Sequence, residues 1–268
     1  MSDDLSPYFA GKRLYGDDFT IEQVREWFAD EAEGYADLGA REKPSYSYGY
    51  HRLNQLHAFN LLRGRQFDHA LGIGSAYGDE FQPIAANIRR ITILDPSDAF
   101  SGVTQVFGTP CAYRKPNVSG DIAFESSSFD LIVSLGALHH IPNVSHVIFE
   151  CYRCLRKNGL MLLREPILSM GDWSKPRPRL TKRERGIPVE LLDEIVQRAG
   201  FTMVRRSLCY FPLIPRLADR LGLAAYNNAT LTSIDAFLSR AFSWNIRYHR
   251  TRLHEKLAPS SVFYVLGK

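Results

Sequence analysis

The feature that most constrains this chain is a glycine-rich turn between two short apolar stretches, in residues 67–95. Gly72 and Gly74 lack a Cβ, so the backbone there can turn sharply and approach a ligand closely. The second apolar stretch ends at Asp95, where a carboxylate can accept hydrogen bonds from ribose hydroxyls. A helix expected to begin near residues 77–80 would present free N–H groups to an anionic group. The pattern predicts a nucleoside-binding β-α-β unit.

Length, charge and cysteine content restrict the class of protein. A chain of 268 residues is long enough for one large α/β domain with an appendage. It contains no apolar run long enough to span a membrane, and its first residues lack the pattern of a signal peptide. The four cysteines form no secreted disulfide framework, which indicates a reducing cytoplasm. A net charge of +4 is too small to indicate nucleic-acid binding, and we expect no nucleic-acid partner.

A longer motif in residues 119–166 makes the prediction specific. Its parts are, in chain order, Ile122-Ala123-Phe124, Ser128-Phe129-Asp130, an apolar run, Leu138-His139-His140 and the segment from Arg153 to Gly159. This order resembles the class I S-adenosylmethionine (SAM)-dependent methyltransferases, in the small-molecule branch called type 11-like. Together with the glycine turn, the resemblance covers roughly residues 65–211 and the last strand.

The resemblance implies a Rossmann-like α/β fold. We expect a seven-stranded, mostly parallel sheet with helices on both faces and an antiparallel last strand. The expected parts are an N-terminal helical cap (1–64), the SAM-binding core (65–211), a helical insertion between the last two strands (212–259) and the final strand (260–268). In the cap, Thr20 is a candidate helix N-cap, and Val24, Trp27 and Phe28 follow at helical spacing.

The glycine turn departs from the family pattern at two positions. A carboxylate usually lies two residues before the first glycine, where this chain has Ala70. The usual third glycine is Ala76, which is still small enough for close approach. Three nearby acids could replace the missing carboxylate: Asp68, Asp79 and Glu80.

The resemblance implies SAM as the cofactor and a set of residues that bind it. These are Gly72, Gly74, Ser75, Ala76, Gly78, Asp95, Pro96, Asn117, Val118, Asp121 and Leu135. For adenine, the family's position falls at Asn117 or Val118, and Asp121 is the alternative. An asparagine can accept a hydrogen bond from an exocyclic amine through its carbonyl oxygen.

Candidate catalytic residues follow two expected strands of the sheet. His139 and His140 come after the apolar strand 129–135, and Glu165 marks the exit of the next strand. An alcohol must lose its proton as its oxygen attacks a methyl group, so we expect a general base: His140 or His139 first, Glu165 second. Adjacent histidines in extended chain point in different directions, so at most one of them acts.

A helix expected over residues 143–157, closed by Gly159, contains the only paired cysteines. Cys151 and Cys154 have a C-x-x-C spacing, which occurs in zinc and redox sites. No second pair of ligands follows them, so we interpret both as core cysteines and expect no metal.

Two basic segments lie after the main motif. Residues 174–185 combine prolines with charges, which predicts a solvated loop; contact with an anionic substrate is the alternative. The insertion combines aromatic residues with arginines: Phe237, Phe242, Trp244 and Tyr248 beside Arg240, Arg247, Arg250 and Arg252. Three interpretations stay open for it: a substrate lid, a homodimer surface, or a helix on an anionic membrane face.

The predicted function is methyl transfer from SAM to a small acceptor, with a hydroxyl of a sugar, a glycan-related compound or another secondary metabolite favoured. The arginines of the insertion favour an anionic or lipid-linked acceptor, and a cytoplasmic or membrane-peripheral location. Two alternatives remain. A catalytically silent SAM-fold partner protein would explain Ala70. A nicotinamide-dependent oxidoreductase would share the glycine turn and Asp95, but it gives no account of residues 128–140.

Overall fold

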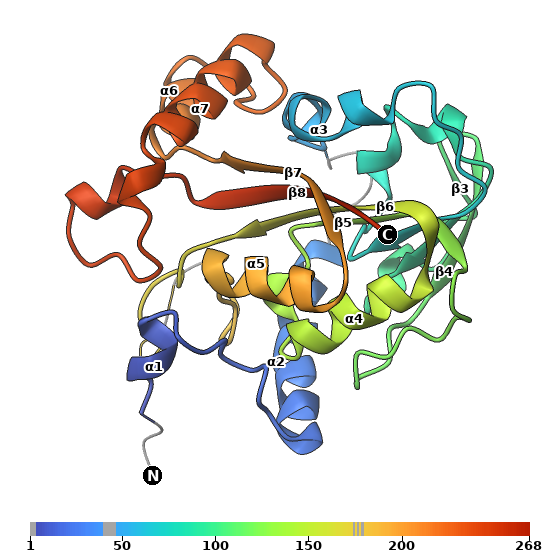
Figure 1. Cartoon of the computed structure of the whole chain (residues 1–268), viewed down its shortest axis with the longest axis horizontal. Coiled ribbons are helices and arrows are strands. Elements are labelled where there is room, and N and C mark those ends of the chain that lie inside the picture. Colours follow the sequence, from blue (N-terminus) through green and yellow to red (C-terminus); the bar gives the residue numbers. More distant parts are fainter. Residues whose placement is uncertain (1–3, 40–46, 174, 176, 178–179) are drawn as a thin grey trace.

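The computed structural model describes residues 4–39, 47–173, 175, 177 and 180–268 (Figure 1). One eight-stranded sheet has the strand order β3-β4-β2-β1-β5-β6-β8-β7. The strands are β1 (Ala70–Ile73), β2 (Ile91–Leu94), β3 (Gln105–Val106), β4 (Thr109–Arg114), β5 (Phe129–Leu135), β6 (Leu155–Pro166), β7 (Thr202–Cys209) and β8 (Ser261–Gly267).

Helices cover both faces of this sheet. The α-helices are α1 (Ser6–Phe9), α2 (Ile21–Gly39), α3 (His51–His57), α4 (Val144–Cys154), α5 (Val189–Arg198), α6 (Leu213–Arg220) and α7 (Ala229–Ala241). Helices α4 and α5 lie on one face, and α3 lies on the other with α6 and α7 (Figure 1). Short 3-10 helices are η2 (Phe59–Leu62), η3 (Asp79–Phe81), η4 (Ala85–Asn87), η5 (Asp98–Phe100), η6 (Leu138–His140), η7 (Ser243–Asn245) and η8 (His254–Lys256).

The strand pairing confirms the expected topology. The pairs β4-β2, β2-β1, β1-β5 and β5-β6 are parallel, while β8 is antiparallel to both β6 and β7. The structure has one strand more than the expected seven, because the two-residue β3 pairs with the edge strand β4. All four residues of β1 are buried, as expected for a central strand that is covered on both faces.

Each face of the sheet has its own hydrophobic core. One core joins β5 and β6 to α4 and α5 and contains both Cys151 and Cys154 as buried, unpaired thiols. The other joins the sheet to α3, α6 and α7. The interpretation of Cys151 and Cys154 as core cysteines is therefore confirmed.

Helix α2 of the N-terminal cap begins where the sequence predicts. Helix α2 starts at Ile21, directly after Thr20. The Gln23 amide donates to Thr20 Oγ1 (3.4 Å), and the Thr20 amide donates to Gln23 Oε1 (2.9 Å). This reciprocal capping box satisfies two amides that the first helical turn would otherwise leave without partners.

Two expected helices differ from the structure. After the glycine turn the chain forms only η3 and η4 instead of an α-helix, because Pro83 lacks an amide hydrogen and interrupts the helical ladder. Helix α4 ends at Cys154 and not at residue 157. Leu155 is already extended and pairs with Phe129 in the sheet, so sheet pairing ends the helix three residues early.

The carboxyl ends of the parallel strands place the candidate residues at one edge of the sheet. The glycine turn follows β1, Asp95 follows β2, and η6 lies after β5. In an open α/β sheet this edge is where ligands bind. No helix in the described part of the chain has the length and apolarity needed to cross a membrane.

Candidate active site

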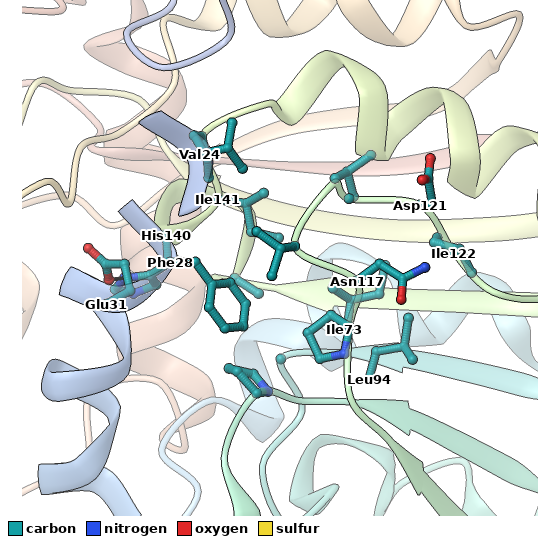
Figure 2. Close-up of a pocket in the computed structure, with 18 residues that line it drawn as sticks. Val24, Phe28, Glu31, Ile73, Leu94, Asn117, Asp121, Ile122, His140 and Ile141 are labelled. Carbon is teal, nitrogen blue, oxygen red and sulfur yellow. Dashed lines mark hydrogen bonds and ion pairs between the residues drawn. The ribbon is translucent and has the colours of Figure 1, made fainter. Parts of the chain in front are cut away.

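Three adjoining pockets lie along this carboxyl edge. The first pocket holds about 820 Å³ of empty space, counted together with the open solvent at its mouth. Its walls are mainly apolar: Ile73 and Leu94 come from the sheet, and Val24 and Phe28 come from α2 (Figure 2). Helix α2 therefore forms one wall of this pocket.

The second pocket lies between the glycine turn and β6. It shares Gly74 and His140 with the first pocket and adds Ser75, Ala76 and Asp95. The third pocket shares Leu135 and Arg164 with the second, and it is also lined by His139, Glu165 and Tyr210. The three pockets thus follow one another along the sheet edge.

The glycines of the turn have different tasks. Gly74 has a φ of +62° and lines both the first and the second pocket. A Cβ on Gly72 would lie 2.4 Å from Ser75 Oγ, and one on Gly78 would lie 2.9 Å from the Val106 side chain. Neither Gly72 nor Gly78 lines these pockets, so both allow the turn to pack against its own surroundings.

Asp95 is buried beneath this turn and lines the second pocket. Its two carboxylate oxygens accept hydrogen bonds from the amides of Ala76 (3.2 Å) and Ser97 (3.0 Å). Burial raises the pKa of Asp95 above its usual range, although these hydrogen bonds act against the rise. A carboxylate offers about four acceptor positions, so two remain for hydroxyl groups of a ligand.

The residues expected at adenine all line the first pocket, together with Pro96. They differ in what their side chains contact. The Asp121 carboxylate accepts hydrogen bonds from Ser119 Oγ and from His146 Nε2, each at 2.7 Å. These local contacts favour Asn117 and Val118 over Asp121 as the residues next to an adenine.

The second pocket also contains two buried charges that the sequence did not single out as a pair. Glu80 is 5% exposed, and burial raises its pKa to about 7. The guanidinium of Arg164, in a side chain 6% exposed, donates to Asn54 Oδ1 (3.2 Å) and to the carbonyl of Leu135 (3.1 Å). It also lies over the ring of Tyr50, 4.5 Å from the centroid. Among the described residues, no carboxylate forms an ion pair with Arg164.

Glu165, in contrast, is fully engaged. Its carboxylate accepts hydrogen bonds from the amides of Ala137 (3.1 Å), Leu138 (2.8 Å) and His139 (3.2 Å), and from His139 Nδ1 (2.8 Å). It thereby holds η6 at the end of β5. With four donors already around it, Glu165 does not fit the second general base expected from the sequence.

His139 does not fit a general base either. Burial alone would lower its pKa, but hydrogen bonds to Glu165 and Glu184 outweigh burial and raise the pKa to about 9. His139 Nε2 lies 3.6 Å from Glu184 Oε1. The imidazole is therefore protonated at neutral pH and has no site for a further proton.

Ligand atoms of His139, His140 and Glu184 lie within 4.8 Å of one another, as they would in some metal sites. Both ring nitrogens of a protonated His139 carry protons, so neither can ligate a metal. We therefore interpret the cluster as an ion-pair network, and the expected absence of a metal stays a prediction.

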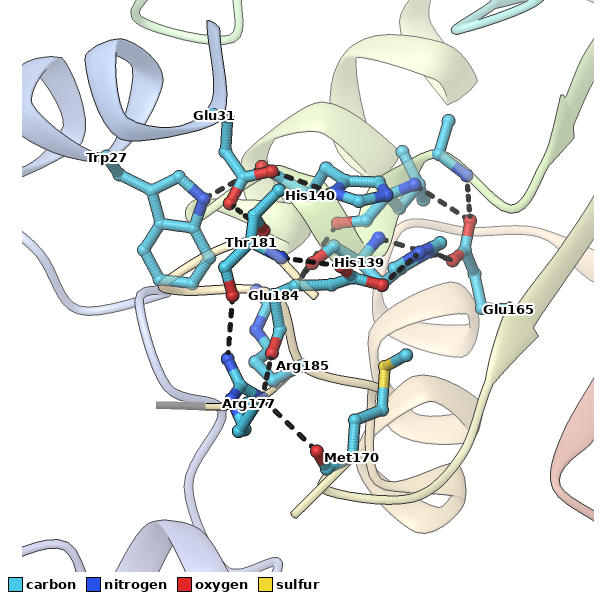
Figure 3. A network of polar contacts seen from close by, with 12 residues as sticks. Trp27, Glu31, His139, His140, Glu165, Met170, Arg177, Thr181, Glu184 and Arg185 are labelled. Atoms are coloured by element: carbon cyan, nitrogen blue, oxygen red, sulfur yellow. Dashed lines mark hydrogen bonds and ion pairs between the residues drawn. The ribbon is translucent and has the colours of Figure 1, made fainter. Parts of the chain in front are cut away.

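His140 lies where the first two pockets meet and has a different carboxylate partner. Its Nδ1 lies 2.8 Å from Glu31 Oε2, and Glu31 is only 3% exposed (Figure 3). The other oxygen of Glu31 accepts a hydrogen bond from Thr181 Oγ1 (2.6 Å). Trp27 of the same helix donates to the carbonyl of His140 (2.8 Å). Helix α2 thus orients the imidazole.

Sequence reasoning did not identify Glu31 as a functional residue. A signal was present, because Glu31 follows Val24, Trp27 and Phe28 at the spacing of one helix face. A carboxylate that continues an apolar stripe must face the interior, where it needs a partner.

The last residues of the basic segment 174–185 are not part of the solvated loop that its charges predicted, although Lys175 and Lys182 are exposed. Arg185 is fully buried and donates to the carbonyls of His139 and Ile141, each at 2.8 Å, behind η6 (Figure 3). Arg183 pairs with Asp30 of α2 at 2.5 Å. These arginines hold the cap onto the site and are not available to an anionic substrate; positions 174, 176, 178 and 179 lie outside the described residues.

Comparison with known proteins identifies the domain that carries this site. Residues 71–163 match the family model described as a methyltransferase domain. The chain carries a class I SAM-dependent methyltransferase domain. The match runs from β1, before the glycine turn, through η6 into β6, so it includes most of the residues that form the three pockets.

Individual relatives of this methyltransferase domain are distant. A probable SAM-dependent methyltransferase of Mycolicibacterium smegmatis is 24% identical over 165 residues, which are 62% of this chain and 57% of that protein. A ubiquinone biosynthesis O-methyltransferase of Xanthomonas oryzae is 25% identical over 140 residues, 51% of this chain and 57% of that protein. The matches thus span little more than half the length of these curated relatives.

A solved structure shares the fold over almost the whole chain. The phosphoethanolamine N-methyltransferase 2 of Haemonchus contortus, in complex with S-adenosylhomocysteine, has a TM-score of 0.55 and 14% identity. The alignment covers 94% of this chain and 61% of that one. At this identity the likeness shows the fold alone.

The residues of the site fit SAM, the cofactor of this methyltransferase domain. Gly74 leaves the junction of two pockets without a side chain, and Asp95 offers acceptors to ribose hydroxyls. The unpaired Arg164 and the buried Glu80 offer one charge of each sign, as a zwitterionic amino acid group requires. Bound SAM supplies an electrophilic methyl group on its sulfonium.

Proposed function

We propose that this protein is an O-methyltransferase that transfers the methyl group of SAM to a hydroxyl oxygen of a small acceptor. The observation that carries the proposal is the Glu31–His140 pair at the junction of the first two pockets. Relatives named as ubiquinone biosynthesis O-methyltransferases, about 25% identical, support oxygen as the acceptor atom.

In this mechanism, His140 accepts the hydroxyl proton at Nε2 as the acceptor oxygen becomes a nucleophile. Glu31 accepts a hydrogen bond from Nδ1, which fixes the tautomer and stabilises the imidazolium that forms. Glu165 and Arg185 hold the backbone of η6, so the imidazole keeps its position. The protein's main contribution is alignment of the donor and the nucleophile.

The cofactor's amino acid group is assigned to the second pocket. The family pattern has a carboxylate at the position of Ala70, and Glu80 replaces it here. Arg164 binds the cofactor's carboxylate. Asp68 lies instead among the surface arginines Arg89 and Arg156, which leaves Glu80 in the better position. The acceptor is assigned to the third pocket, next to Leu135 and Arg164, with its reacting hydroxyl extending into the adjoining second pocket, which His140 lines.

A catalytically silent SAM-fold protein is the remaining alternative. Such a protein would need the cofactor pockets, but it would have no use for a buried carboxylate that orients His140. The match of residues 71–163 to a methyltransferase model removes the nicotinamide alternative.

The test compares binding with turnover in variants of the pair. Titration with S-adenosylhomocysteine and with NADH first checks the cofactor. An acceptor is then found by screening phenols and sugars with methyl-labelled SAM. We expect His140→Ala to lower kcat by about 10²–10⁴-fold and to leave S-adenosylhomocysteine affinity nearly unchanged.

Glu31→Gln is the matched variant, because it keeps the size of the side chain but removes its charge. It should lower kcat less than His140→Ala, because the amide oxygen of glutamine can still accept the hydrogen bond from Nδ1. Full turnover of His140→Ala would exclude His140 as the base.

A further inference from the structure

Exposed apolar side chains are concentrated in the insertion between β7 and β8. Among the described residues, fourteen large hydrophobic side chains are exposed, and nine of them belong to residues 212–259. They are Leu213, Leu217, Leu221, Leu223, Ile234, Phe237, Trp244, Leu253 and Leu257. A soluble surface rarely gathers so many, and such a concentration marks an interaction site.

Helix α6 is apolar on two sides. Ile214 and Ala218 are buried and attach the helix to the core that includes α7. Leu213 and Leu217, with Leu221 directly after the helix, follow at intervals of four and are 45%, 44% and 58% exposed. Residues at this interval share one face, so α6 presents a leucine stripe outward that packing against the core does not require.

Exposed apolar side chains also lie near the end of α7, the second helix of the insertion. Phe237 on α7 is 70% exposed, and Trp244 in η7 is 72% exposed. Two other residues expected on this surface have structural roles instead: Tyr248 donates to the carbonyl of Gly186 (2.8 Å), and Arg250 donates to the carbonyl of Ala258 (3.1 Å). The exposed aromatic contacts are therefore Phe237 and Trp244.

The same segment carries the positive charge of the chain. Residues 212–259 contain seven Arg and Lys and three Asp and Glu, a net +4 that equals the formal net charge of the whole chain. Arg216 and Arg220 each precede a leucine of the stripe, so they lie beside it on α6. Within the described residues, no ion pair involves either of them. This combination of apolar stripe and flanking cations is the pattern of helices that lie on membrane surfaces.

The insertion lies beside β7 and β8, at the opposite end of the molecule from β3 and β4 (Figure 1). We propose that residues 212–259 bind the surface of an anionic lipid membrane. The leucine stripe and Trp244 enter the boundary between headgroups and acyl chains, while Arg216 and Arg220 contact lipid phosphates.

Charge favours a lipid surface over a second copy of the chain. In a symmetric dimer the same patch meets itself, so two surfaces of net +4 would face each other. Anionic headgroups instead neutralise these charges. Six of the nine exposed apolar side chains are leucines, which offer no stacking platform for nucleic-acid bases; only Phe237 and Trp244 do.

The position of the insertion adds a consequence that rests on the proposed function. The third pocket is lined by Tyr210 and Ser261, which flank the insertion in the chain. A membrane-bound insertion would thus place the acceptor pocket next to the lipid, which suits a lipid-linked acceptor.

The experiment measures co-sedimentation of the full chain with vesicles of phosphatidylcholine alone and of phosphatidylcholine with phosphatidylglycerol. We expect binding to the anionic vesicles that weakens as salt is added. Changing Leu217→Glu and Leu221→Glu together should weaken this binding by about tenfold or more. Arg216→Glu should also weaken it.

Phe149→Glu on α4 is the matched control, because Phe149 is 40% exposed but lies outside the insertion. It should bind vesicles like the unchanged protein, and all variants should keep S-adenosylhomocysteine affinity, which shows that they fold. Absence of binding to anionic vesicles, or an equal loss in the control, would overturn the proposal. So would a dimer in sedimentation velocity that the leucine variant dissociates.

Discussion

Two groups of buried charges lie at the same sheet edge, and they differ in their partners. Around η6 the charges are paired: Glu165 binds three amides and His139, and Arg185 binds backbone carbonyls. In the second pocket, Arg164 has no ion-pair partner among the described residues, and Glu80 carries a raised pKa. A buried charge is costly unless it is paired, so the first group stabilises the fold and the second indicates where a charged ligand binds.

The sharpest test of the paired group is Glu165→Ala. The change leaves three amides without an acceptor and removes one of the two carboxylates beside the protonated His139. We expect the free energy of unfolding to fall by about 3–5 kcal/mol, as when one partner of a buried pair is removed. Urea denaturation measures this loss. Glu165→Gln, which keeps an acceptor oxygen, should lose less, and a loss below about 1 kcal/mol for the alanine variant would mean that the pairing is not structural.

For the unpaired group, the informative change is Arg164→Met, which keeps a long side chain but removes the charge. We expect S-adenosylhomocysteine affinity to fall by about 1.5–3 kcal/mol, the range for hydrogen bonds to charged groups. Calorimetry with 5′-methylthioadenosine, which lacks the amino acid group, supplies the control and should give nearly the same affinity in both proteins. Unchanged S-adenosylhomocysteine affinity would mean that Arg164 does not bind the cofactor, and would assign it to the acceptor in the third pocket.

The smallest expected effect concerns the pH dependence of Glu80. Burial raises its pKa from 4.5 to about 7, so the free protein loses stability as pH rises from 4.5 through 7, because the unfolded carboxyl ionises more easily. A cofactor ammonium favours the ionised form. S-adenosylhomocysteine should therefore bind about tenfold more weakly at about pH 6 than at about pH 8. Glu80→Gln should show a nearly flat profile over this range, and a flat profile in the unchanged protein would exclude the contact.

The sequence alone determined the parts of the fold and site that depend on local patterns. The glycine turn, Asp95 and the Leu138-His139-His140 segment lie at the carboxyl edge as expected, and the last strand is antiparallel. Strand identity follows from apolar runs, and a turn's backbone needs particular residues at particular positions, so both can be read from neighbours in the chain.

Only the tertiary structure decided which charged groups meet. Glu31 and His140 are 109 residues apart, and Asn54 and Arg164 are 110 residues apart. No local pattern encodes such pairs, because they form only when α2 and α3 pack against opposite sides of the sheet edge. The tertiary structure also gives His139 and His140 different roles, although they are neighbours in sequence and have the same side chain. Two carboxylates keep the imidazole of His139 protonated in spite of its burial, while His140 faces the cofactor pockets.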